Sequence, residues 1–204
     1  HMSSRHVDPA SDGESGREAE TPTGPRIHVF PSRTGAPTGE TAREAEDLPG
    51  VFFYFDLGSP YAYLSAERIS RLFAAAELPQ PEWKPVLLGG LFARFDRGSW
   101  GLTETRTAGM REIEQRAAAQ GLQPIRWPDP WPGDMLHAMR VAPYAKSIGR
   151  TVSFALAAFR QAFAAGRDLT DPDNVAIAAA ACELHPNAIA RGAGSAGVKA
   201  RLRE

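Results

Sequence analysis

The balance of apolar and polar positions divides the chain near residue 50. Residues 1–49 hold mainly Ser, Thr, Gly, Pro, Glu and Arg. Such a composition does not bury enough apolar surface to offset the entropy lost on ordering. We therefore expect a disordered leader over 1–49, in which His1-Met2 resembles the remnant of an expression tag, followed by a single folded domain over 50–204.

The folded part begins with a strand and a helix. The apolar run 52–55 predicts a strand, and Ser59-Pro60 opens the helix that follows it. A second strand is expected over 82–88, where Pro85 favours an edge position or a bulge.

Helical patterns dominate the rest of the chain. Residues 103–120 predict a helix that ends at Gly121, and Thr170-Asp171-Pro172 predicts the start of another, with Asp171 as its cap. Val152, Leu156, Phe159 and Phe163 recur at a helical interval and predict a stripe that faces the core.

The segment 123–133 joins two of these helical regions and is too rich in proline for regular structure. Its tryptophans, Trp127 and Trp131, either cover an apolar substrate pocket or pack the loop onto the helices.

Ser59 is the leading candidate for chemistry. A helix N-terminus presents unpaired N–H donors and about half a positive charge, so it can hold an anion such as a thiolate. The alternative is structural, because Ser followed by Pro is also an ordinary helix start with Ser as the N-cap. The local pattern by itself favours the capping role, and the wider sequence context favours the chemical one.

Five motifs in order resemble one family. They are FYFDLGSPYAYL (53–64), WKPVLLGGLF (83–92), IRWP (125–128), LHAMR (136–140) and VKARLRE (198–204). Together they resemble the 2-hydroxychromene-2-carboxylate isomerases and kappa-class glutathione transferases, which belong to the DsbA-like branch of the thioredoxin superfamily.

This resemblance implies an α/β, thioredoxin-like (DsbA-like) fold with a large all-helical insertion. The expected parts are an N-terminal βαβ unit over 51–90, the insertion over 91–195 and the start of a returning helix over 196–204. Family members continue into a cis-proline loop, two strands and a closing helix, so the C-terminal strands are missing from this chain. Either the sequence is truncated, or it is a partial domain with a rebuilt or oligomeric core.

The resemblance also implies which residues form the site. Ser59 stands where relatives with a Cys-x-x-Cys motif have the first cysteine, so it would hold the thiol of a bound cofactor, with Pro60 and Tyr61 beside it. Relatives carry a Lys and a Gly-Asn after the GGLF motif, and Arg94 and Ser99 are the candidates for their roles. The remaining substrate-binding candidates are Trp100 and Trp127, while Arg94 would also bind a substrate carboxylate.

The implied activity is a thiol-dependent isomerisation of a conjugated aromatic acid, with glutathione or another low-molecular-weight thiol as the cofactor. One alternative is a kappa-like glutathione transferase, which would leave the thiol attached to the substrate. Another is a catalytically silent binding or assembly module, whose uncovered sheet edge would pair with a second copy in a homodimer.

Composition and charge bear on which partners, metals and cellular location we expect. A net charge of −1 with interspersed charges predicts no nucleic-acid partner. The sequence has neither a signal-peptide pattern nor a run of about 18 apolar residues, so we expect a cytoplasmic protein without a membrane partner. The five histidines lack metal-ligand spacing, and no metal is expected. Cys182 is the one cysteine and is predicted to be buried and inert.

Overall fold

The computed structural model describes residues 50–184 and Leu202. Two parallel strands, β1 (Phe52–Phe55) and β2 (Glu82–Pro85), form its sheet, and α2 (Pro60–Ala75) connects them. Phe52 lies opposite Glu82, and Phe55 lies opposite Pro85. The predicted leader over 1–49 and the predicted helix over 196–204 lie almost entirely outside the described residues.

The second strand is shorter than the sequence predicted. It ends at Pro85, and the helix α3 (Leu88–Arg94) begins where the prediction still had strand. The reason lies in the partner strand: β1 ends at Phe55, whose carbonyl accepts the last bond of the ladder from the Val86 N–H at 2.9 Å. Pro85 pairs in register without a bulge, in a strand that has only β1 beside it in the described part of the chain.

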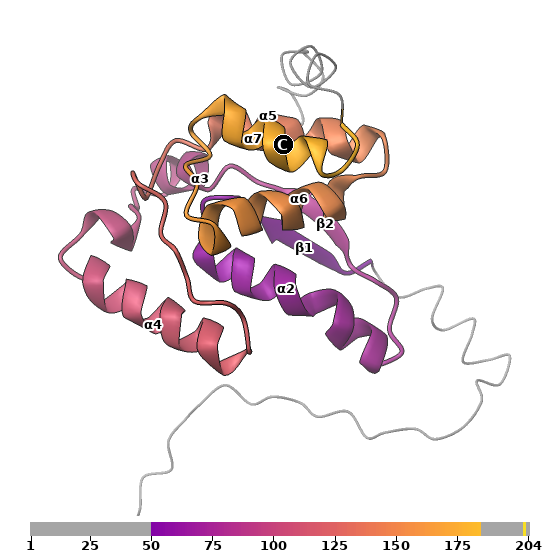
Figure 1. Ribbon diagram of the computed structural model, residues 1–204, viewed down its shortest axis with the longest axis horizontal. Helices are drawn as coiled ribbons and strands as arrows, with labels where there is room; N and C mark the ends of the chain where they lie inside the picture. Colours follow the sequence, from indigo (N-terminus) through magenta and orange to yellow (C-terminus); the bar gives the residue numbers. More distant parts are fainter. Residues whose placement is uncertain (1–49, 185–201, 203–204) are drawn as a thin grey trace, which may run out of the picture. The chain divides into compact units, whose positions relative to one another are not determined.

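Helices make up most of the remaining described chain (Figure 1). In chain order they are η1 (Trp100–Leu102), α4 (Arg106–Ala119), α5 (Leu136–Ser147), α6 (Thr151–Phe159), η2 (Arg160–Ala164) and α7 (Pro172–Ala180).

Two of the predicted helix signals are confirmed. Gly121 follows α4 with a left-handed φ of 70°, and the Asp171 carboxylate caps α7 by accepting the Asp173 N–H at 2.9 Å. The start of α4 differs from the prediction, because residues 100–102 form the separate 3₁₀ turn η1. The Thr103 hydroxyl then donates to the Trp100 carbonyl at 2.8 Å, which delays the helix until Arg106.

Aromatic side chains join the sheet to the helices. Phe55 lies edge-on to Trp83 and to Phe159, and the ring of Tyr63 stacks on Phe163 with centroids 5.5 Å apart. These contacts bury one face of the sheet against α2 and α6, which lie over the strands in Figure 1. Tyr63 is therefore a core residue.

The predicted core stripe of α6 is wrong at its first position. Val152 is 40% exposed, whereas Phe154, which lies outside the stripe, is fully buried. Buried positions instead fall four residues apart, at 154, 158 and 162 and at 155, 159 and 163. This wider spacing suits η2, a π-helical turn in which the Ala165 N–H donates to the Arg160 carbonyl.

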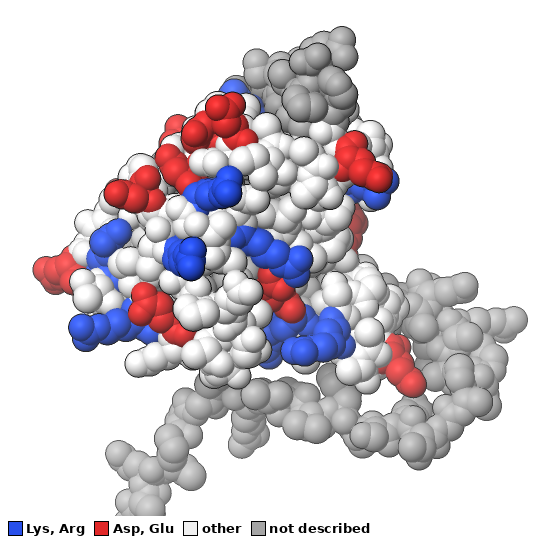
Figure 2. Space-filling model, viewed as in Figure 1, with Lys and Arg blue, Asp and Glu red and all other residues white. Residues whose placement is uncertain are grey.

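On the face that Figure 2 shows, basic and acidic side chains both occur, and neither sign covers the face alone. None of the described helices is long and apolar enough to span a bilayer. The described residues also contain no group of three His, Cys, Asp or Glu side chains arranged to hold a metal ion.

Candidate functional site

The candidate site begins with a tight turn between β1 and α2. The Ser59 N–H donates to the backbone carbonyl of Asp56 at 3.0 Å, which closes the turn over residues 56–59. Within it, the Gly58 N–H donates to Oδ1 of Asp56 at 2.8 Å. The strand therefore ends in a turn that delivers Ser59 directly to the start of α2.

Ser59 is the N-cap of α2. Its backbone is extended, its Oγ accepts the Ala62 N–H at 3.2 Å, and Pro60 occupies the first helical position. Ser59 therefore has the structural role of an N-cap, which the sequence offered as the alternative to a chemical role. Capping uses the Ser59 oxygen as an acceptor only, so the hydroxyl hydrogen is still able to donate.

A backbone donor lies beside that hydroxyl. Pro60 has no N–H, the Ala62 N–H binds Ser59 Oγ, and the Tyr63 N–H binds the Ser59 carbonyl at 3.1 Å. Among the described residues, the Tyr61 N–H has no hydrogen-bond acceptor. The start of α2 thus offers two donors to an anion at its positive end.

Residues of the loop before α5 and of α5 itself also contact this turn. The indole N–H of Trp131 donates to the Gly58 carbonyl at 3.1 Å, and the Leu57 N–H points to Sδ of Met139 at 3.3 Å. A Cβ on Gly58 would come within 2.8 Å of the Met135 side chain, so the close approach requires glycine. The position of Ser59 therefore depends on residues more than 70 positions away in the chain.

Asp56 connects this turn to α3. Its Oδ2 accepts the Leu88 N–H at 2.8 Å, while Oδ1 holds Gly58. Asp56 is 5% exposed and is the one charged side chain in the described chain that is buried. Burial raises the pKa of its carboxyl, and the two backbone N–H donors partly oppose that rise.

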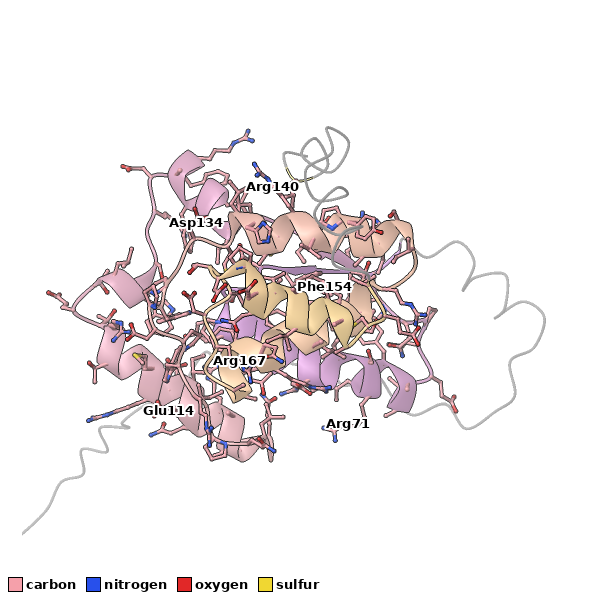
Figure 3. All side chains as sticks on the ribbon, turned by 45° about the horizontal axis from the view of Figure 1, so that its top comes forward. Arg71, Glu114, Asp134, Arg140, Phe154 and Arg167 are labelled. Carbon is pink, nitrogen blue, oxygen red and sulfur yellow. The ribbon has the colours of Figure 1, made fainter. Side chains whose placement is uncertain are left out.

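A cavity of about 570 Å³ opens between the turn, α3 and the loop before α5. Most of its lining is apolar or glycine. Its polar side chains are those of Asp56, Arg97, Ser99 and Asp134. Figure 3 shows Asp134 immediately before α5 and near α3. Pockets that bind small molecules have this character, with a mainly apolar wall and a few polar groups.

The predicted site residues divide into two groups. Ser59, Pro60 and Tyr61 share the start of α2, and Ser99 lines the cavity, where it also caps η1 by accepting the Gly101 N–H at 3.2 Å. Trp100 lies near Tyr61, with ring centroids 6.4 Å apart.

The remaining predicted residues point elsewhere. Arg94 is exposed and its guanidinium lies 6.0 Å from the ring of Phe95, so it is not part of the cavity wall that the structure describes. The indole N–H of Trp127 donates to the Glu114 carboxylate at 2.8 Å, and its ring packs beside Trp131. These contacts agree with the alternative in which the tryptophans pack the loop onto the helices. The binding roles given to these residues stay predictions.

Sequence reasoning missed Asp56, Arg97 and Asp134 as cavity residues. A signal was present for Asp56, because an acidic residue directly after an apolar strand is either exposed or must find backbone partners. No local signal separates Arg97 from Arg94, since both lie in the same polar stretch.

Comparison with protein families gives a match over residues 50–204, to the DSBA-like thioredoxin domain. The chain belongs to this family. The DsbA-like thioredoxin fold, with two of its strands in the described residues, accounts for the βαβ unit and for the helices inserted after it. Comparison with curated proteins returned no significant match.

Two solved structures share the DsbA-like fold. A 2-hydroxychromene-2-carboxylate isomerase superposes with a TM-score of 0.65 at 16% identity, covering 74% of each chain. A probable DsbA oxidoreductase from Streptomyces coelicolor superposes with a TM-score of 0.55 at 19% identity, covering 74% of this chain and 70% of its own. Both are similar in fold to this DsbA-like domain.

Proposed function

We propose that this DsbA-like domain binds a low-molecular-weight thiol, glutathione or a similar compound, at Ser59 and uses it to isomerise a conjugated aromatic acid. One observation carries the proposal. The Ser59 hydroxyl and the Tyr61 N–H both lie at the positive end of α2, directly after Gly58, which lines a largely apolar cavity. The likeness in fold to a 2-hydroxychromene-2-carboxylate isomerase supports it.

The start of α2 would hold the cofactor as a thiolate. The Ser59 hydroxyl donates to the sulfur while its oxygen keeps capping the helix, and the helix N-terminus favours the negative charge. The same environment lowers the pKa of a protein cysteine at a helix start. This chain has no cysteine there, and its one cysteine, Cys182, cannot form an intrachain disulfide.

A bound thiolate supplies a nucleophile that adds to a conjugated double bond and later leaves, so that the bond can rotate in between. The chain positions the acid for this step. Apolar side chains of the cavity wall, such as Leu88, Phe92 and Met135, fit an aromatic ring. Arg97 lines the same cavity and would pair with the carboxylate of the substrate, a role that the sequence gave to Arg94.

Calorimetric titration with reduced glutathione, and separately with a second low-molecular-weight thiol, tests the proposal. We expect the wild type to bind one of them and Ser59→Ala to weaken binding by about 1.5–3 kcal/mol, the range for a hydrogen bond to a charged group. If neither thiol binds, the proposal fails and Ser59 is a helix cap alone.

Two matched variants separate thiol binding from capping. Ser59→Gly removes the hydroxyl donor, and Gly at an N-cap costs only a few tenths of a kcal/mol relative to Ser, so the variant should fold normally and still lose affinity. Ser65→Ala removes a hydroxyl from an exposed position of the same helix and should bind like the wild type. Product analysis then distinguishes an isomerase, which regenerates the thiol, from a transferase, which accumulates a thioether.

A further inference from the structure

The buried carboxylate of Asp56 has a structural task but no chemical one in the function proposed above. It lines the same cavity as Gly58 and Ser99, and it is 5% exposed. A carboxylate in such a place is costly unless it is well hydrogen-bonded or takes up a proton.

Asp56 and Ser59 are the two ends of one turn. The Ser59 N–H donates to the Asp56 carbonyl at 3.0 Å, and the ends of such a turn have Cα atoms within about 7 Å of each other. A sulfur that accepts a hydrogen bond from Ser59 would lie close to this end of the turn. The Oδ1 atom of Asp56 accepts the N–H of Gly58, the residue before Ser59, at 2.8 Å, so this carboxylate is the candidate acceptor for a proton leaving that sulfur.

The Asp56 carboxylate has unoccupied lone-pair sites that can accept that proton. An ionised carboxylate offers about four lone-pair sites, and the N–H groups of Gly58 and Leu88 occupy two of them. Those two bonds hold the group in place and favour its charged form, whereas burial favours the neutral form. Burial is the larger of the two effects, so the pKa of this carboxyl is raised.

We propose that Asp56 accepts the proton of the cofactor thiol when the thiol binds at Ser59. The S–H bond breaks, its electron pair stays on sulfur, and the proton forms an O–H bond on the carboxylate, so the total charge of the complex is unchanged. The proton returns to sulfur when the thiol leaves. This inference rests on the proposed function, because it needs a thiol at Ser59.

Two other charged side chains line the cavity, Arg97 and Asp134. Both residues are exposed, and the Asp134 carboxylate accepts the Leu136 N–H at 2.9 Å. Among the described residues, Asp56 forms no ion pair with either of them. The other side chains that hold the turn, those of Trp131, Met135 and Met139, are uncharged. Asp56 is therefore the one buried carboxylate among the residues that line this cavity.

Counting protons during glutathione binding tests the assignment. Calorimetry in buffers of different ionisation enthalpy, at a pH below the usual thiol pKa of about 8.5, gives the number of protons released, and ultraviolet absorbance reports the thiolate. With the wild type we expect thiolate to form while close to zero protons leave the complex. Release of about one proton per thiolate would show that water, and not Asp56, takes the proton.

Asp56→Asn supplies the matched comparison. The variant keeps an acceptor for Gly58 but is not able to take up the proton, so thiolate formation should now release about one proton per bound glutathione. Asp134→Asn makes the same chemical change on the same cavity and should behave like the wild type. A release close to zero from Asp56→Asn with thiolate formed would assign the proton to another group.

Infrared difference spectroscopy of the wild type keeps the test independent of how well Asp56→Asn folds. We expect a protonated-carboxyl band to appear when glutathione binds, and its absence beside a formed thiolate would overturn the role of Asp56. Failure of glutathione to bind the wild type would instead overturn the proposed function, and this inference with it. The two failures are therefore distinguishable.

Discussion

At the scale of single residues, Asp56 shows how one buried carboxylate organises a site. It holds Gly58 on one side and Leu88 on the other, and so joins the turn before Ser59 to the start of α3. Both bonds go to backbone amides and not to a cation. The carboxylate therefore has hydrogen bonds but no opposite charge to offset the loss of water around it.

The raised pKa of Asp56 predicts a pH dependence of folding. Because the folded state binds this proton more tightly than the unfolded state, the stabilising contribution is complete below about pH 4 and is lost as the pH rises through the folded pKa. The free energy of unfolding of the wild type, measured by denaturant titration, should show this decline after subtraction of the Asp56→Asn curve.

Asp134→Asn is the control for that measurement, because it removes an exposed carboxylate from the same cavity. A difference between wild type and Asp56→Asn that rises with pH over this range would contradict the direction of the shift.

At the scale of elements, two helical glycines, Gly109 and Gly89, differ in how closely other side chains pack against them. Gly109 lies within α4, and a Cβ there would come within 2.4 Å of the Trp100 ring. Gly89 lies within α3, and a Cβ there would meet nothing within 4 Å. Helix propensity alone favours Ala at both positions by about 1 kcal/mol, so any difference between them reports packing against η1.

We predict that Gly109→Ala lowers the free energy of unfolding and that Gly89→Ala raises it. Overpacking costs about 1–3 kcal/mol and the gain in propensity is about 1 kcal/mol, so Gly109→Ala should lose up to about 2 kcal/mol. Gly89→Ala should gain up to about 1 kcal/mol. Denaturant unfolding of the two variants measures both values, and equal stability would show that Trp100 moves aside without cost.

At the scale of the whole described domain, one core connects the sheet to the helices. It extends from Phe55 and Trp83 in the strands to Val175 and Cys182 at the end of the described helices. Cys182 is 7% exposed, as its apolar surroundings predicted. A reagent therefore reaches this thiol readily only when α7 or the turn over 181–184 opens.

Labelling of Cys182 by a thiol-specific reagent measures that opening. We predict much slower labelling in the native protein than in denaturant, with each 1.4 kcal/mol of opening free energy slowing the reaction about tenfold. Because the chain has a single cysteine, the signal needs no assignment. Labelling at the denatured rate under native conditions would contradict the burial of this side chain.

The sequence by itself determined the features that depend on neighbours along the chain. The strand at 52–55, the Ser59-Pro60 and Asp171-Pro172 helix starts and the stop at Gly121 follow from local backbone chemistry. The order of the motifs was also sufficient to indicate the DsbA-like fold, which the family comparison confirms.

Only the tertiary structure decided where the second strand ends and which polar side chains share the cavity. β2 ends at Pro85 because β1 has no further residue to pair with it. The helix α3 then begins at Leu88, whose N–H donates to the Asp56 carboxylate. Arg97 lines the cavity whereas Arg94 lies over Phe95. These outcomes depend on contacts between residues far apart in sequence, and such contacts leave no periodic pattern in the chain.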